Sequence, residues 1–228
     1  MGIPLRLDAT FILVPLALFS AMPNHLYEAV WPAAAVATLG VFLSILLHEV
    51  GHAAAARWQQ VGVAEIVVGG FFGYATLKHQ TVFRKQQLRI LFAGPLANLA
   101  IFVLLWSLLA LSARSGTGVG LLAYQPGQAM GWLGEATRVL ALVNLAMFVF
   151  NMVPAFPLDG GKILGLLLVR RLSPRRSMQV VSVLSILAGV LMVFLGLGLS
   201  LFLALIGILI VVTNVRRLKR RAGASSSA

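Results

Sequence analysis

Long apolar segments recur along the whole of this 228-residue chain, and they constrain its fold more than any other feature. Several of them approach the roughly 20 residues that an α-helix needs to cross the hydrocarbon core of a bilayer. Because 60% of the residues are hydrophobic and only 11% are charged, a soluble domain of this length could not bury them all. The sequence therefore predicts an all-α membrane protein whose main solvent is lipid.

Proline, glycine and polar clusters divide the apolar segments into six predicted transmembrane helices. Their approximate ranges are 7–21, 33–58, 88–111, 135–153, 178–195 and 199–215. The last two result from splitting a run that is too long for one span and has Gly196 and Gly198 at its middle. A short helical piece is expected over 160–171. Residues 1–221 are interpreted as one polytopic domain, and residues 222–228, which are Ala, Gly and Ser, as a disordered tail.

The basic residues predict the orientation of this bundle. If the N-terminus is cytoplasmic, sixteen of the eighteen Lys and Arg residues fall on the cytoplasmic side, and only Arg114 and Arg138 fall on the other. The positive-inside rule then predicts a multi-pass cell-membrane protein with both termini in the cytoplasm. Because the net charge of +12 comes from these short clusters, we expect the lipid bilayer, and no nucleic acid, as the partner of the basic residues.

Two histidines and a glutamate lie together inside the second apolar segment, where ionisable groups cost at least a few kcal/mol. They are His48, Glu49 and His52, in the pattern His-Glu-x-x-His. On a helix the two histidines are one turn apart on one face and can bind one Zn²⁺. Glu49, about 100° around the helix, can take the proton of a zinc-bound water that attacks a carbonyl. The alternative is a chance match, with both histidines hydrogen-bonded to neighbouring helices.

A catalytic zinc site with two histidines needs a third protein ligand and an open fourth position. The candidate is Asp159, in the segment Asn151-Met-Val-Pro-Ala-Phe-Pro-Leu-Asp-Gly-Gly161, where two prolines interrupt the helix. Asp159 could instead cap the helix that follows it. Two arguments favour ligation: the predicted topology places Asp159 at the cytoplasmic depth of the histidines, and Zn²⁺ with Asp159 and Glu49 is neutral overall.

These two motifs together resemble those of the site-2 protease family of intramembrane metalloproteases. The resemblance covers nearly the whole chain and implies the compact microbial type without PDZ or CBS domains. It implies one zinc ion per chain on His48, His52 and Asp159, with Glu49 as the catalytic residue, toward the cytoplasmic side. The implied reaction is hydrolysis of a peptide bond within or near a transmembrane segment of a membrane-protein substrate. Control would then depend on substrate availability or on a membrane-anchored regulator.

Three further residues match the family's motifs. The motif asparagine, here Asn151, implies an auxiliary catalytic role in positioning substrate or stabilising the oxyanion, and packing between helices is an equal alternative. Gly94 and Asn98 match a Gly-x-x-x-Asn element on the third predicted helix. Small residues spaced by four most often allow close helix packing, so no catalytic role is expected for this pair.

A Gly-rich segment from Val67 to Ala75 resembles the membrane-associated β-hairpin that follows the catalytic helix in this family. An edge strand there could pair with an unwound substrate segment by strand addition. An ordinary apolar re-entrant loop is the alternative. The residues expected to contact substrate are Gly69, Gly70, Phe71 and Phe72.

Other functions fit the sequence less well. An ion or proton transporter could use the same histidines and carboxylates as an ion site, but it would need a second polar path across the membrane. The outer halves of the predicted helices are almost wholly apolar. Thiol catalysis is excluded because the chain has no cysteine, and the motifs of serine and aspartyl intramembrane proteases are missing.

Overall fold

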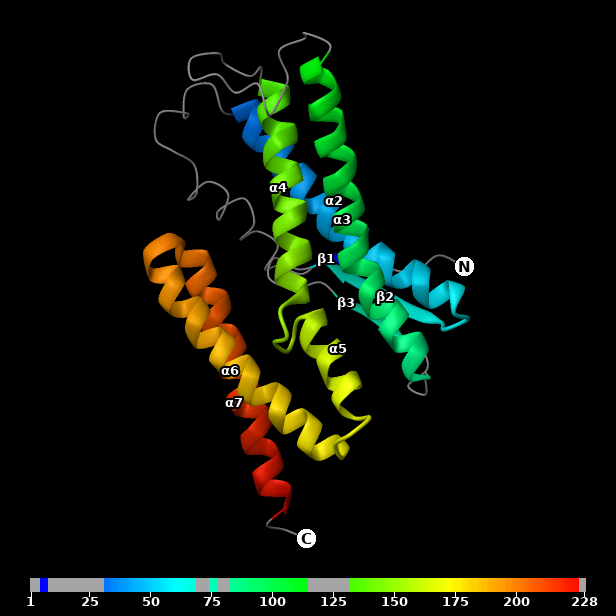
Figure 1. The fold of residues 1–228 in the computed structure, drawn as a ribbon, viewed down its shortest axis with the longest axis vertical. Coiled ribbons are helices and arrows are strands. Elements are labelled where there is room, and N and C mark those ends of the chain that lie inside the picture. Colours follow the sequence, from blue (N-terminus) through cyan, green and yellow to red (C-terminus); the bar gives the residue numbers. More distant parts are fainter. Residues whose placement is uncertain (1–4, 8–30, 69–73, 78–82, 115–131, 226–228) are drawn as a thin grey trace. The chain divides into compact units, whose positions relative to one another are not determined.

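A computed structural model describes residues 5–7, 31–68, 74–77, 83–114 and 132–225 of the chain (Figure 1). These residues form long helices and one small sheet. The helices are α2 (Trp31–Trp58), α3 (Arg84–Arg114), α4 (Trp132–Met152), α5 (Asp159–Leu168), α6 (Pro174–Leu199) and α7 (Leu201–Ser225). The strands are β1 (Leu5–Leu7), β2 (Val63–Val68) and β3 (Tyr74–Leu77).

Four of the described helices, α2, α3, α6 and α7, are long and apolar enough to cross a membrane. Helix α4 contains a shorter apolar section, Ala136–Met152. The prediction of a membrane protein built mainly from helices is therefore confirmed. The count of six transmembrane helices stays a prediction, because nearly all of the first predicted helix, 7–21, lies outside the described residues.

Several helices extend beyond their predicted ends. Helix α3 begins at Arg84, and α7 continues to Ser225, past the point at which the sequence predicts a disordered tail. Hydropathy marks only the apolar part of a helix. Lys, Arg, Gln and Ala have favourable helix propensities, so they can continue the same helix into water at little cost in free energy. The break between α6 and α7 falls at Ser200, whose backbone is extended with φ −166° and ψ 120°.

The three strands form one sheet in the order β1–β2–β3. Strands β2 and β3 pair antiparallel directly after α2, with Ile66 opposite Ala75, as the sequence predicts for this segment. The residues between them, 69–73, lie outside the described residues, so the predicted substrate contacts of Gly69–Phe72 stay a prediction. Strand β1 is parallel to β2, with Leu5 opposite Ile66. Strand β1 is not predicted from the sequence, because parallel pairing between distant segments leaves no local signal.

The chain divides into two compact units, and the interpretation of residues 1–221 as one polytopic domain stays a prediction. The first comprises Met1–Val82 and Phe92–Val149, and the second comprises Phe83–Leu91 and Phe150–Ala228. Single helices carry the chain from one unit to the other, because the division falls within α3 and near the end of α4.

In the first unit, α2 ends in a hydrogen-bonded turn that leads the chain into the sheet. Gln60 adopts a left-handed backbone with φ 59°. The amide of Val61 donates to the carbonyl of Ala56 at 2.8 Å, and the amide of Gln60 donates to the carbonyl of Arg57 at 2.9 Å. This Schellman arrangement satisfies the last carbonyls of the helix. It fixes the direction of β2 relative to the helix that carries both histidines.

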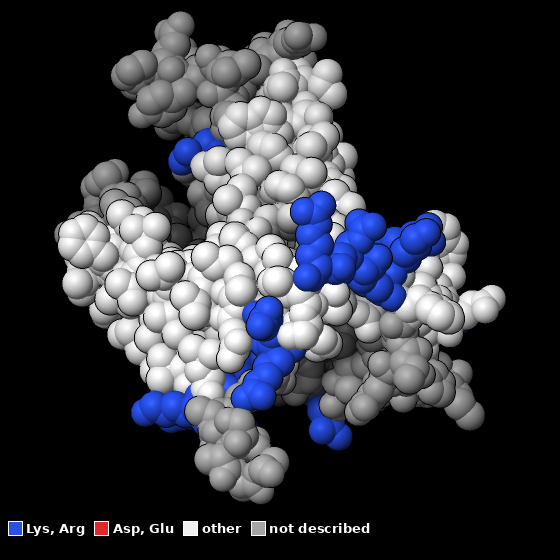
Figure 2. Space-filling model, turned by 60° about the horizontal axis from the view of Figure 1, so that its bottom comes forward, with Lys and Arg blue, Asp and Glu red and all other residues white. Residues whose placement is uncertain are grey.

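In the second unit, α6 and α7 pack side by side as an antiparallel hairpin (Figure 1). Their backbones meet at two glycines: a Cβ on Gly207 would lie 2.6 Å from the carbonyl oxygen of Gly189. Small residues of this kind allow the close approach on which helix pairs in lipid depend. The start of α6 and the end of α7 lie at one end of the hairpin, and both carry exposed basic residues, among them Arg175, Arg176 and Arg220. Figure 2, in which the bottom of Figure 1 comes forward, shows Lys and Arg side chains in blue.

Candidate metal centre

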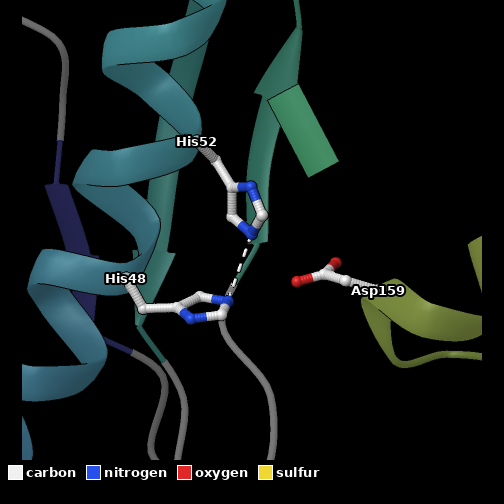
Figure 3. A group of neighbouring side chains, drawn as sticks. All are labelled: His48, His52 and Asp159. Atoms are coloured by element: carbon white, nitrogen blue, oxygen red, sulfur yellow. Dashed lines mark hydrogen bonds between the residues drawn. The ribbon is translucent and has the colours of Figure 1, made fainter. Parts of the chain in front are cut away.

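His48, Glu49 and His52 lie within one turn of α2, and all three are buried, with exposed fractions of 5%, 3% and 7%. The two imidazoles project from the same face of the helix, as their spacing predicts. Their Nε2 atoms are 3.1 Å apart (Figure 3), and the rings are nearly perpendicular, at 84°. The pair of histidines predicted from the sequence is therefore formed within the first unit.

This pair has the geometry of two ligands on one metal ion. Zinc binds imidazole nitrogen at about 2.0–2.1 Å with tetrahedral angles, so two such nitrogens lie about 3.3 Å apart. The observed separation of 3.1 Å between the Nε2 atoms is close to that value. The donor type and the spacing both fit a zinc ion.

Glycine at position 94 of α3 keeps the space beside the imidazoles open. A Cβ there would lie 2.8 Å from Nε2 of His48 and 2.5 Å from Cε1 of His52, with Nε2 of His52 closer still. Helix α3 approaches this closely because a Cβ on Gly51 of α2 would likewise lie only 2.8 Å from the carbonyl oxygen of Ala93. The expected close packing at Gly94 is therefore present. It also leaves, in front of two ring nitrogens, a space that a methyl group would fill.

Asn98 has a role beyond the helix packing that its sequence element predicts. Its side chain is fully buried, and its Oδ1 lies 2.5 Å from Nδ1 of His48. The sequence did contain a signal, because Asn98 follows Gly94 by one helical turn and so shares the face that approaches the histidines. The first unit thus presents His48 with a polar partner on the side of its ring away from His52.

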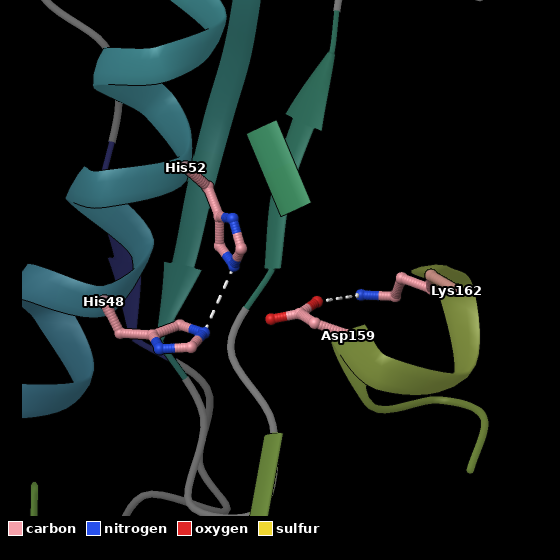
Figure 4. Close-up of polar contacts among 4 residues, drawn as sticks. All are labelled: His48, His52, Asp159 and Lys162. Atoms are coloured by element: carbon pink, nitrogen blue, oxygen red, sulfur yellow. Dashed lines mark hydrogen bonds and ion pairs between the residues drawn. The ribbon is translucent and has the colours of Figure 1, made fainter. Parts of the chain in front are cut away.

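In the second unit, Asp159 is the first residue of α5 and is 4% exposed. Its Oδ1 accepts a hydrogen bond from Nζ of Lys162 at 3.0 Å, an ion pair within the first turn (Figure 4). The N-cap position belongs to Leu158, whose side chain makes no capping hydrogen bond. The capping alternative for Asp159 is therefore wrong. The carboxylate is instead stabilised by the positive end of the helix dipole and by Lys162.

The loop before Asp159 is hydrogen-bonded to α6 and α7 through the backbone of Phe156. The amide of Phe156 donates to Oγ of Ser185 at 2.7 Å, and its carbonyl accepts from Nδ2 of Asn214 at 2.7 Å. The guanidinium of Arg217 lies 3.9 Å from the centre of the Phe156 ring, a cation–π contact. Two prolines keep this loop out of helix, so its backbone groups need partners from elsewhere. Helices α6 and α7 supply them and so hold the segment that presents Asp159.

Glycines 160 and 161 allow this loop to fold back on itself. A Cβ on Gly160 would lie 2.6 Å from the carbonyl carbon of Met152, and a Cβ on Gly161 would lie 2.7 Å from the carbonyl oxygen of Ala155. Larger residues would push the loop away from the start of α5. The Asp-Gly-Gly sequence is therefore explained by backbone packing around Asp159.

Asn214→Ala tests whether the hydrogen bond to the carbonyl of Phe156 holds Asp159 in place. The variant leaves the carbonyl of Phe156 without its donor, which costs about 1–3 kcal/mol of unfolding free energy. We expect a lower thermal midpoint and a several-fold loss of metal affinity. Ser182→Ala is the matched control, because Oγ of Ser182 is buried on α6 and bonds no other described atom. Unchanged metal affinity in Asn214→Ala would show that the loop keeps its position without this contact.

Two sets of candidate residues can now be placed. His48, His52 and Asp159 are the described residues that could hold a metal ion, and all three are buried. Asn151 lies in the last turn of α4 and is half-buried, and its auxiliary role stays a prediction.

Comparison with known proteins identifies the family to which this chain belongs. A model of peptidase family M50 matches residues 36–131 and 115–196. A zinc metalloprotease of Methanocaldococcus jannaschii is 29% identical over 213 residues, which cover 92% of this chain and 56% of that protein. A Synechocystis protein provisionally named a zinc metalloprotease is 33% identical over 134 residues, 59% of this chain and 31% of its own length. The chain thus spans between 31% and 56% of these two relatives.

A solved structure shows the same fold. The site-2 protease from Methanocaldococcus jannaschii matches with a TM-score of 0.65 and 26% identity, over 95% of this chain and 91% of that chain. The resemblance predicted from the two motifs is thereby confirmed. Because the matched family model covers well over half of its residues, the chain belongs to peptidase family M50.

Proposed function

We propose that this chain is an intramembrane zinc metalloprotease that hydrolyses a peptide bond within or near a transmembrane segment of a membrane protein. The observation that carries the proposal is the buried cluster of His48, Glu49 and His52 inside a helix apolar enough to cross a membrane. Two imidazoles and a carboxylate are costly in such a helix, so a function must account for them. Membership of a metallopeptidase family accounts for all three.

The proposed zinc ligands are His48, His52 and Asp159, with one ion per chain. The three form one candidate metal group with every member buried. Asp159 and Glu49 would balance the charge of the ion, which reduces the cost of burial. A zinc ion bound there would supply an activated water and a Lewis acid for the scissile carbonyl.

The other residues have roles that follow from their positions. Glu49 follows His48 directly on α2 and is the proposed general base, which takes a proton during attack and returns it to the departing amine. Asn151 is the proposed donor to the oxyanion or to the substrate backbone. A helical substrate has its amides engaged internally, so it must unwind before the β2–β3 segment, including Gly69–Phe72, can pair with it.

The proposed location is the cell membrane, with both termini and the active site toward the cytoplasm. The basic residues at one end of the α6–α7 hairpin support this orientation, because positive residues concentrate on the cytoplasmic side. The partners would be a transmembrane protein substrate and a membrane-anchored regulator.

A proteomic comparison tests the function as a whole. Membrane fractions of cells with the wild-type chain are compared with fractions of cells carrying the double variant His48→Ala/His52→Ala. We expect at least one membrane-anchored protein to accumulate uncut in the variant, with loss of its released fragment. The transporter alternative predicts a different result: ion flux into sealed vesicles that requires both histidines, with no cleavage product in cells. That outcome would overturn the proposal.

Asp159→Ala tests the third ligand. Removal of a ligand should reduce zinc affinity by more than the roughly 100-fold that loss of an outer hydrogen-bond partner costs. Metal analysis of the purified protein provides the measurement. Lys162→Ala is the control, because it breaks the same ion pair but leaves the carboxylate, and it should retain zinc. Full zinc occupancy in Asp159→Ala would remove Asp159 from the ligand set.

A further inference from the structure

A set of buried, uncharged polar side chains extends from His48 into the interior of the first unit. Its members are Ser44 on α2, Asn98 on α3 and Asn144 on α4, with exposed fractions of 2%, 0% and 0%. We call these three residues the asparagine network. Buried polar groups cost free energy unless they are hydrogen-bonded, and the proposed chemistry uses none of the three. Their presence beside a metal ligand therefore needs another explanation.

The direction of the hydrogen bonds in this network is set by backbone carbonyls, which can only accept. Nδ2 of Asn98 lies 3.3 Å from the carbonyl oxygen of Ser44, so this atom must be the amide NH₂. The same group donates to Oδ1 of Asn144 at 2.9 Å. Nδ2 of Asn144 donates to the carbonyl of Leu140 at 2.8 Å and to Oγ of Ser44 at 2.9 Å. The Ser44 hydroxyl then donates to the carbonyl of Gly40 at 2.7 Å.

This direction determines which nitrogen of His48 carries hydrogen. Because NH₂ of Asn98 faces Ser44 and Asn144, its Oδ1 faces Nδ1 of His48, at 2.5 Å. An amide oxygen cannot donate, so Nδ1 of His48 must be the donor. A neutral imidazole with hydrogen on Nδ1 has its lone pair on Nε2. That Nε2 is the atom 3.1 Å from Nε2 of His52.

We propose that Asn98, held by Asn144 and Ser44, is a positioning residue that fixes the ring and the tautomer of His48 before metal binds. The inference rests on the metal site of the proposed function. An imidazole without this partner would divide among tautomers and ring orientations, and the metal would bind only the competent fraction. A hydrogen-bond acceptor on the ring nitrogen that faces away from the metal commonly orients a histidine ligand.

The choice of an amide fits the surroundings. Carboxylates often hold histidine ligands in this way, but the charge of the proposed site is already balanced by Asp159 and Glu49. A further carboxylate inside an apolar bundle would add an uncompensated charge. An asparagine accepts the same hydrogen bond from Nδ1 and remains neutral. Its amide group also ties α3 to α2 and α4 through Ser44 and Asn144.

The first measurement reads the tautomer in metal-free protein. The chain has only four histidines, so ¹⁵N-histidine NMR of the whole protein in lipid nanodiscs can resolve His48, assigned by its loss in His48→Gln. We expect Nδ1–H in the wild type and a mixture of tautomers in Asn98→Leu, which has nearly the same volume. Asn98→Asp keeps an acceptor oxygen and should restore Nδ1–H. Ser182→Ala, at a buried polar residue outside the network, should leave the wild-type signal.

The second measurement is zinc affinity, by competition with a chromogenic chelator. Asn98→Leu should bind zinc about 10–100-fold more weakly than the wild type, and Asn98→Asp should recover part of this loss. Asn144→Leu and Ser44→Ala touch no ligand and should cause smaller losses in the same direction. They also carry the test if Asn98→Leu does not fold.

Three results would overturn the inference. They are a wild-type tautomer in Asn98→Leu, unchanged zinc affinity in that variant, or equal damage by Asn98→Leu and Asn98→Asp, which would mean a packing role only. A wild-type protein that binds no zinc would instead reject the proposed function, and the metal-free tautomer measurement would still decide the role of Asn98.

Discussion

Glu49→Gln is expected to lower the cleavage rate by about 10²–10⁴-fold, the usual contribution of general acid–base catalysis, while zinc content stays at the wild-type value. Glutamine matches glutamate in size, so the buried packing around this residue, which is 3% exposed, should survive. Its amide cannot accept the proton that the attack releases. Cleavage of a transmembrane substrate in reconstituted bilayers, together with metal analysis, provides the measurement.

Glu49→Asp is the matched variant for this prediction. It keeps a carboxylate but withdraws it by one methylene, so activity should lie between that of the wild type and that of Glu49→Gln. Zinc-loaded Glu49→Gln with nearly wild-type turnover would contradict the general-base assignment. Loss of zinc from Glu49→Gln would mean that Glu49 is a ligand.

Gly94→Ala is expected to abolish stable zinc binding. The added methyl carbon would lie 2.8 Å from Nε2 of His48 and 2.5 Å from Cε1 of His52. Such overpacking typically lowers the free energy of unfolding by about 1–3 kcal/mol. The His48 ring has little freedom to retreat, because Asn98 holds its Nδ1. Either α3 or the rings must move, and both changes separate the nitrogens from the position of an ion. Zinc titration of the purified variant measures the loss.

Gly198→Ala is the control for this substitution. Nothing lies within 4 Å of a Cβ at position 198 of α6, and alanine favours a helix over glycine by about 1 kcal/mol. This variant should therefore keep its zinc and unfold at the same or a higher temperature. If Gly94→Ala and Gly198→Ala bind zinc equally well, the space beside the imidazoles is not the metal position.

Features that depend on neighbouring residues could be predicted from the sequence. The spacing of His48 and His52 places both on one face of a helix, and the structure has them there. Strands β2 and β3 pair within one short segment, where the family resemblance implies a hairpin. The break between α6 and α7 was expected within two to four residues of Ser200, because glycines interrupt the apolar run.

Features that depend on how distant segments meet could not be predicted in the same way. The sequence contains Asn98 in a recognisable element, but its bond to His48 depends on where α2 and α3 cross, and that crossing is set by Gly51 against Ala93. Phe156 is likewise hydrogen-bonded to Ser185 and Asn214, which lie on two later helices. The capping alternative for Asp159, which the sequence left open, fails by one residue, since the helix begins one position earlier than predicted.

The close crossing of α2 and α3 means that main chain, with no side chain beyond hydrogen at Gly94, borders the imidazole pair on one side. Main chain has no rotamers, so this border keeps its shape when neighbouring side chains change. The opposite face of α2 carries exposed Leu43, Leu47 and Val50, which are free to vary with lipid thickness and composition. The imidazole pair and the exposed apolar side chains therefore occupy separate faces of the same helix, so a change on the exposed face leaves the border of the imidazoles unaltered.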